Sequence, residues 1–331
     1  MSRCEELGPM TPPTTAALTL SLTGRYQRQG THAADGIRLW AEAAGVRLTI
    51  VDDRGSGQVA IDAYGSWLDT VDLLIGPYAS GLVRAIAPLV RETGRVLWNH
   101  GGSADDLAQP GIATLPAPAS SYFDGVIDEA ADRNLSRVIV VRAQGPFAHS
   151  VADGARARAS ERGIDSRTVE ASAVETEEVA DAAVLVAGPF EHDAEVVRRL
   201  RDRGQSPALL AAVAAGFSDF GPELGEAAEG VLGPVQWWPS AERPEFGPSG
   251  NEFAAGYQRR TGREPSYPGA LAAAAGHLAH AAHGLGLEAE DLPGWATSTL
   301  LGDFTLDAAW RQVGHRVTTI QWRNGQMAPL A

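Results

Sequence analysis

The stretch LTLSLTGRYQRQGTHAADGIRLWAEAAGVRLTIVDDRGSG, residues 18–57, shows the pattern that decides the fold. Its first five residues are rich in leucine and predict a β-strand. An amphipathic helix is expected over residues 35–44 and ends at Gly45, and residues 46–51 predict a second strand. A strand, a helix and a strand in close succession indicate a β-α-β unit with parallel strands.

The same alternation continues to the Pro116-Ala-Pro118 break and then starts again. Near-continuous apolar strands predict doubly wound parallel sheets that are covered by helices on both faces. In the first unit, strands are expected at 73–75 and 95–98 and a helix at 82–91. In the second unit, strands are expected at 138–141, 183–186 and 208–213 and helices at 126–133, 151–162 and 194–203. The remaining chain predicts helices at 251–260 and 269–283, hairpin-like segments at 304–306 and 318–322, and a tight turn at Asn324-Gly325.

The amino-acid composition excludes several classes of function and of binding site. The chain has 331 residues and a net charge of −14, and its length predicts two packed units. The negative charge disfavours nucleic acid as a partner. One cysteine allows neither an internal disulfide nor a cysteine-based zinc site. All 27 basic residues are arginine, and the absence of lysine excludes P-loop and Schiff-base chemistry. No cofactor is expected.

The N-terminal extension, residues 1–16, has no apolar segment typical of a signal peptide. Cys4 allows a lipid-anchor interpretation, but no apolar run precedes it. No stretch approaches 18 apolar residues, so membrane insertion is not expected. The chain is expected to be periplasmic or extracellular if an export signal was removed, and cytoplasmic if this N-terminus is native.

Several short motifs follow one another in a specific order along residues 17–331. They are LSLTG at 20–24 with Gly30, Asp52-Asp53, Ile75-Gly76-Pro77 with Ser80, Gly101-Gly102-Ser103, Phe253 with Tyr257, Gly262 and Pro265, Gly302 with Phe304 and Leu306-Asp307, and QWRNG at 321–325. Their order and spacing resemble the type I periplasmic solute-binding proteins, especially the branched-chain amino acid-binding branch.

This resemblance implies two Rossmann-like lobes that are joined by a three-crossover hinge and close around a ligand. Residues 17–117 and 241–298 would form lobe 1, and residues 118–240 and 299–331 would form lobe 2. The chain would be the ligand-binding component of an ABC importer, would present its ligand to a permease and would not be an enzyme. A cytoplasmic sensor of the same fold and a branched-chain amino acid binder stay open as alternatives.

Ser80 and Ser103 each follow an expected strand and precede an expected helix. Helix N-termini suit a carboxylate because their N–H groups are unpaired. The resemblance implies that these serines, with the backbone near Gly101, hold the carboxylate of the ligand. Simple N-capping is the alternative for both. His100 is expected to donate a hydrogen bond to a ligand oxygen or to complete the cleft wall.

The amino acid binders of the family also hold the ligand's ammonium group with acidic residues. This chain has Ala119-Ser-Ser121 and Ala214-Ala-Gly216 at the corresponding places, and Ser121 joins the candidate site there. A buried ammonium without acceptors would cost about 3–5 kcal/mol, or about two to four decades in affinity. The sequence therefore predicts a carboxylate ligand without an α-amino group.

Aromatic residues stand where the family has cleft walls, and flat rings favour an aromatic ligand. The candidates are Phe147, Phe190 and Tyr267, with Trp98 at a strand end and Tyr26 and Gln29 in the first loop. Core packing stays open for Trp98 and for the Trp237-Trp238 pair.

The three-residue spacing of His277, His280 and His283 turns them to different sides of a helix, which disfavours a metal site. No Gly-x-Ser-x-Gly motif surrounds Ser80 or Ser103, so catalysis is not expected.

Overall fold

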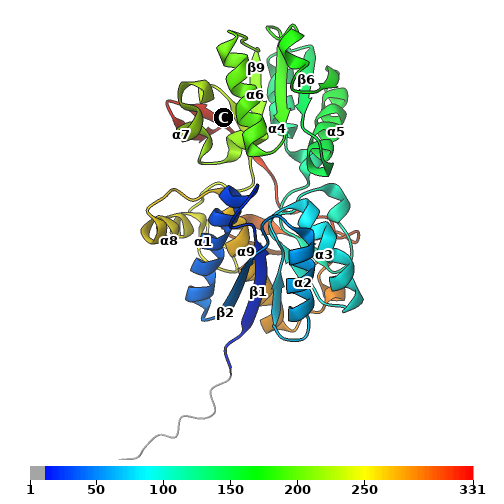
Figure 1. The fold of residues 1–331 in the computed structure, drawn as a ribbon, viewed down its shortest axis with the longest axis vertical. Coiled ribbons are helices and arrows are strands. Elements are labelled where there is room, and N and C mark those ends of the chain that lie inside the picture. The colour runs from blue at the N-terminus through cyan, green and yellow to red at the C-terminus, as the bar shows by residue number, and fades with distance from the viewer. Residues whose placement is uncertain (1–11, 331) are drawn as a thin grey trace, which may run out of the picture.

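The computed structural model describes residues 12–330, which form two α/β lobes arranged along the long axis of the molecule (Figure 1). Cys4 and most of the predicted extension 1–16 lie outside the described residues. The predicted fold class is confirmed, because each lobe holds a largely parallel sheet between helices.

The first lobe is built on a five-stranded parallel sheet of order β2-β1-β3-β4-β5. Its strands are β1 (Thr15–Leu20), β2 (Arg47–Asp52), β3 (Leu73–Ile75), β4 (Leu97–Asn99) and β5 (Ile112–Thr114), and its helices are α1 (Gln27–Ala44), α2 (Gly57–Trp67), α3 (Ser80–Glu92), α8 (Gly250–Thr261) and α9 (Tyr267–Leu285). Helices α1 and α9 approach closely because glycines face each other. A Cβ on Gly36 would lie 2.0 Å from the carbonyl oxygen of Gly269.

The second lobe holds a seven-stranded sheet of order β14-β13-β10-β9-β8-β6-β7. Its strands are β6 (Arg137–Arg142), β7 (Asp165–Val169), β8 (Ala182–Ala187), β9 (Leu209–Ala212), β10 (Leu232–Val235), β13 (Thr318–Arg323) and β14 (Gln326–Pro329), and its helices are α4 (Asp124–Asp132), α5 (Pro146–Glu161), α6 (Phe190–Asp202) and α7 (Phe220–Leu224). Only the pairs made by β13 are antiparallel. Asn324 and Gly325 have φ of 52° and 73°, which confirms the predicted hairpin turn.

The third connection between the lobes comes later in the chain than expected. Strands β11 (Thr297–Thr299) and β12 (Gly302–Phe304) form a separate two-stranded sheet. Phe304 packs against Trp98 of the first sheet, with ring centroids 6.3 Å apart. The chain therefore stays on the first lobe beyond residue 299. Leu306 still bridges Pro293, and Trp310 lines a surface pocket with Arg91 and Arg95.

The three connections between the lobes meet at Gln236, which is 1% exposed. Its amide accepts from the N–H of Ala117 (3.0 Å) and donates to the carbonyl of the same residue (3.3 Å). The Nε2 of His315 lies 3.0 Å from its Oε1. One buried side chain therefore links all three segments that connect the lobes.

Candidate functional site

A cavity of about 250 Å³ lies between the lobes, where the loops after several parallel strands meet. Both lobes supply its walls, Ser80 and Gly101 coming from the first lobe and Phe147 and Phe190 from the second. The structure brings most of the predicted residues to this cavity. They are Tyr26, Gln29, Ser80, Gly101, Ser103, Phe147, Phe190 and Tyr267.

Two serine hydroxyls in the wall are free to donate. Ser80 Oγ accepts from the N–H groups of Ser103 and Ala104, both at 3.2 Å. Ser103 Oγ accepts from the hydroxyl of Tyr122 at 3.0 Å. Because these contacts use acceptor positions, each serine keeps its own proton for another acceptor. Together with Gly101, these serines form what we call the anion site.

The N-capping alternative for the two serines is wrong. Helix α3 begins at Ser80 itself, its N-cap residue is Ala79, and no side chain caps it. Ser103 precedes only a 3₁₀ turn, Asp105–Leu107, which also lacks a side-chain cap. Both hydroxyls are bonded as part of the cavity wall, so local helix termination does not account for them.

The loop that carries Gly101 and Ser103 is shaped by Asn99, which sequence reasoning missed. Buried Asn99 accepts from the N–H groups of Gly101 (3.2 Å) and Gly102 (2.8 Å) and donates to the carbonyl of Gly102 (2.7 Å). A Cβ on Gly101 would lie 2.2 Å from the carbonyl oxygen of Tyr78. Only glycine therefore allows this loop to approach the loop before α3.

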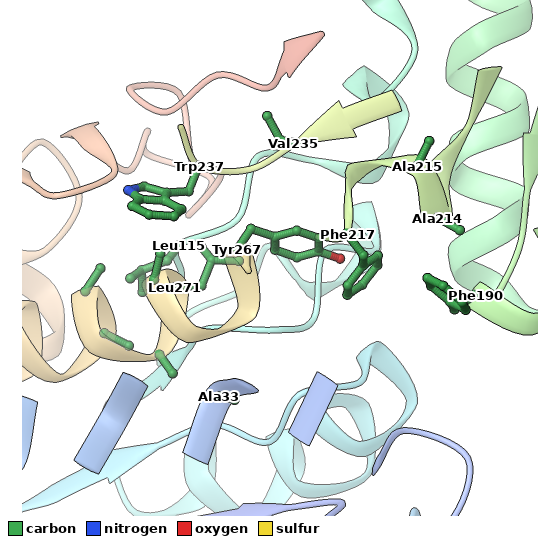
Figure 2. Close-up of a cluster of buried hydrophobic side chains, with 14 of the residues drawn as sticks. Ala33, Leu115, Phe190, Ala214, Ala215, Phe217, Val235, Trp237, Tyr267 and Leu271 are labelled. Atoms are coloured by element: carbon green, nitrogen blue, oxygen red, sulfur yellow. The ribbon is translucent and has the colours of Figure 1, made fainter. Parts of the chain in front are cut away.

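The remaining walls are largely aromatic, and Figure 2 shows Phe190, Phe217 and Tyr267 next to one another. The Phe217 and Tyr267 centroids lie 4.7 Å apart, and those of Tyr122 and Phe147 lie 5.5 Å apart. Sequence reasoning missed Tyr78, Tyr122 and Phe217, although Tyr78 directly follows the Ile75-Gly76-Pro77 motif.

No aspartate or glutamate is among the described residues that line the cavity. Arg25 and Arg84 are the only charged residues among the described ones that line it. Arg84 is paired with Asp106 through two hydrogen bonds of 2.8 and 2.7 Å, whereas the Arg25 guanidinium lies 5.5 Å from the ring centre of Tyr26. The cavity is therefore better suited to an anion than to a cation.

The structure does not bring three of the predicted residues to the cavity. Trp98 packs against Trp295 and Phe304, both at 6.3 Å, as the core alternative allowed. Ser121 donates its hydroxyl proton to the carbonyl of Pro118 at 2.8 Å. His100 is fully buried, and neither ring nitrogen has a partner among the described residues. Burial lowers its pKa to about 4, so the imidazole is neutral at pH 7.

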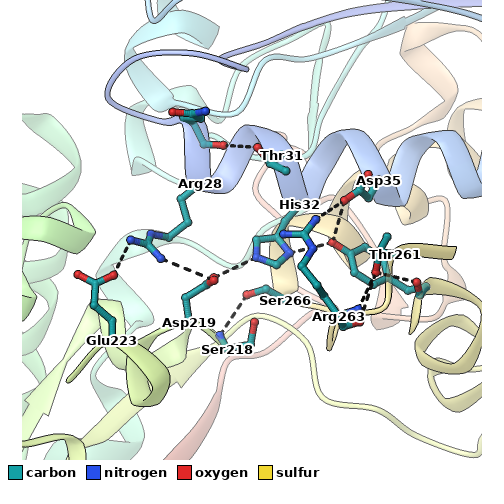
Figure 3. Close-up of polar contacts among 12 residues, drawn as sticks. Arg28, Thr31, His32, Asp35, Ser218, Asp219, Glu223, Thr261, Arg263 and Ser266 are labelled. Carbon is teal, nitrogen blue, oxygen red and sulfur yellow. Dashed lines mark hydrogen bonds and ion pairs between the residues drawn. The ribbon is translucent and has the colours of Figure 1, made fainter. Parts of the chain in front are cut away.

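A group of polar contacts joins α1 of the first lobe to the region of α7 in the second (Figure 3). Arg28 donates to Glu223 at 2.6 Å and lies 3.6 Å from Asp219, while His32 Nε2 lies 3.0 Å from Asp219. Burial raises the pKa of Asp219, but the His32 hydrogen bond and the nearby positive charges outweigh this and hold it below its ordinary value. We call Arg28, His32, Asp219 and Glu223 the interlobe cluster.

Residues 13–326 match the sequence model of a family described as periplasmic binding protein. The chain belongs to this family. Its two lobes have the type I periplasmic binding protein fold, as the sequence motifs indicated. No curated protein sequence matches the chain significantly.

Solved structures share the fold at low sequence identity. A leucine-binding protein from Thermotoga maritima has a TM-score of 0.82 and 19% identity, over 96% of this chain and 98% of that one. A solute-binding protein of an ABC transporter from R. palustris, in complex with benzoate, has a TM-score of 0.79 and 14% identity, over 97% and 96%. Another from Rhodopseudomonas palustris BisB5, in complex with 3,4-dihydroxybenzoic acid, has a TM-score of 0.80 and 15% identity, over 96% of each chain.

None of the described helices is both long and apolar enough to cross a membrane. Within residues 12–330, no three His, Cys, Asp or Glu side chains are grouped so that they could hold a metal ion. His280 instead packs edge-on against Trp40, with centroids 6.3 Å apart.

Proposed function

We propose that this chain is the solute-binding component of an ABC importer and that its ligand is a small aromatic carboxylate. The proposal rests on the combination of features in this cavity. Two serine hydroxyls can donate into it, its walls are aromatic, and no acidic side chain is among its described lining residues. The carboxylate would accept from Ser80 and Ser103, and the ring would lie among Phe147, Phe217 and Tyr267.

Charge argues against an amino acid as the ligand. An α-ammonium group would enter a cavity whose charged residues are Arg25 and Arg84. Segments 119–121 and 214–216 correspond to the places where the resemblance implies acidic groups in amino acid binders, and they offer only small side chains here. The cost of about 3–5 kcal/mol for an unpaired buried charge supports a ligand without this group.

Family membership supports delivery of the ligand to a membrane permease and a location in the periplasm or outside the cell. The benzoate and dihydroxybenzoate complexes show that this fold can carry aromatic acids in other proteins. Closure of the two lobes would bury the ligand, and the interlobe cluster supports a closed arrangement.

Isothermal titration calorimetry with benzoate and leucine tests the proposal. Benzoate is expected to bind at least a hundredfold more tightly than leucine, because only leucine carries the unpaired ammonium group. Tight binding of leucine would overturn the assignment of the ligand class. Absence of binding for a panel of aromatic acids, with a folded protein, would do so as well.

A further inference from the structure

Gln29 is a buried amide in the cavity wall that has no hydrogen-bond partner among residues 12–330. It lies in the first turn of α1, is 5% exposed and lines the cavity. Its Oε1 is buried without a hydrogen bond, and its Nε2 makes none with a described residue either. A buried polar group of this kind destabilises the protein unless something that enters the cavity satisfies it.

We propose that the ring of the ligand carries a hydroxyl group and that Gln29 binds this hydroxyl. The inference rests on the proposed function, since it takes the carboxylate to be held at the anion site. The contact between Gln29 and the ring hydroxyl would be a second polar contact to the ligand, and it would favour a hydroxylated aromatic acid over an unsubstituted one.

The position of Gln29 in the sheet supports this role. Helix α1 follows β1 and helix α3 follows β3, and these two strands are neighbours in the order β2-β1-β3-β4-β5. The chain reverses its direction of winding between β1 and β3, which is where doubly wound sheets bind ligands. Neighbouring strands lie about 5 Å apart. Gln29 and the anion site therefore line the same cavity at this switch point, so one ligand can contact both.

A hydroxyl group suits this amide better than a charged substituent. It can donate to Oε1 or accept from Nε2, so it fits whichever way the amide is turned. A second carboxylate could accept from Nε2 but would leave Oε1 without a donor. An ammonium group would meet Arg25 and Arg84 and no acidic side chain among the described lining residues. The hydroxyls of Tyr78 and Tyr267, which also line the cavity, bond each other at 2.9 Å, so only one of their two protons is left for another acceptor.

Calorimetry with 3-hydroxybenzoate, 4-hydroxybenzoate, 4-methylbenzoate and benzoate tests the inference on the wild-type protein. Methyl and hydroxyl groups are similar in size, so their comparison isolates the hydrogen bond. At least one hydroxybenzoate is expected to bind about five- to a hundredfold more tightly than 4-methylbenzoate. If benzoate binds and the methyl compound binds as well as both hydroxybenzoates, the inference is wrong and the proposed function stands. If none of the acids binds, the proposed function fails, and the inference fails with it.

A substitution then assigns the preference to one side chain. Gln29→Met keeps the length of the side chain but removes the amide, and is expected to bring the ratio of the two dissociation constants close to one. Gln144→Met is the matched control, because Gln144 also lines the cavity but is exposed and already donates to Glu170 at 3.2 Å. The control is expected to keep the wild-type ratio. A Gln29→Met protein that keeps it too would overturn the role of Gln29.

Discussion

Asp219 is expected to control how firmly the lobes close. It lies in the second lobe and contacts two residues of α1 in the first, His32 at 3.0 Å and Arg28 at 3.6 Å. Asp219 does not line the cavity. Asp219→Ala therefore removes contacts between the lobes and leaves the walls around the ligand unchanged.

How much Asp219→Ala destabilises the closed state depends on how exposed the contacting side chains are. The side chain of His32 is 3% exposed, whereas those of Asp219 and Arg28 are 31% and 28% exposed. A partly exposed ion pair contributes about 0.2–1 kcal/mol, and a hydrogen bond to a partly buried charged group contributes about 1 kcal/mol or slightly more. Together these contacts stabilise closure by about 1–2 kcal/mol, which corresponds to about five- to thirtyfold in the closed population.

Calorimetry measures this effect as an affinity, because a ligand held by both lobes binds the closed state. When the closed state is the minor one without ligand, the dissociation constant rises by the full factor. Asp219→Ala is thus expected to weaken benzoate and every other ligand about five- to thirtyfold and in equal proportion.

Asp181→Ala is the control, because Asp181 pairs with Arg137 within the second lobe. It is expected to leave the affinity for ligand at the wild-type value. The reasoning would be refuted if Asp219→Ala bound ligand as tightly as the control, or if it changed the preference among ligands and not their common affinity.

Three further outcomes are expected. Ser80→Ala removes a hydroxyl donor to the ligand carboxylate and is expected to weaken benzoate binding about ten- to a hundredfold in calorimetry; an unchanged affinity would remove Ser80 from the anion site. The wild-type protein is expected to lose stability as pH falls from about 6.5 to about 4, because burial lowers the pKa of His100 to about 4 in the folded protein and the unfolded chain therefore binds the proton first. His100→Phe is expected to lose less stability than wild type in thermal melts across this range, and parallel curves would contradict the assignment. Gln236→Met leaves the buried backbone groups of Ala117 without partners. It is expected to lower the free energy of unfolding by about 2–4 kcal/mol in urea titrations. A change below about 0.5 kcal/mol would show that Gln236 does not hold the connecting segments together.

The local pattern of apolar and polar residues explains which helices and strands were predicted well and which were missed. Strand β3 was predicted at its observed limits because all three of its residues are apolar and buried, which is typical of a central parallel strand. Helix α2 was missed because Gly65 interrupts its pattern and only three of its side chains are buried. Strand β7 was also missed, since it lies at a sheet edge and is largely exposed.

The site was predicted in part. Ser80, Gly101 and Ser103 could be found because each directly follows a recognisable strand, and chain order alone brings such positions to one edge of a parallel sheet. Tyr122 and Phe217 could not be found in this way. They reach the cavity only because the chain crosses between the lobes and folds back, so their neighbours are distant in sequence.

The amino-acid sequence by itself determined the two α/β units, the family and the lack of acidic residues at 119–121 and 214–216, since periodicity, motif order and composition are local properties. The tertiary structure decided which hydroxyls keep a free proton, which rings face the cavity and that Gln29 has no partner. Hydrogen-bond satisfaction depends on every group nearby in space, and packing of the two lobes supplies groups that no local pattern reveals.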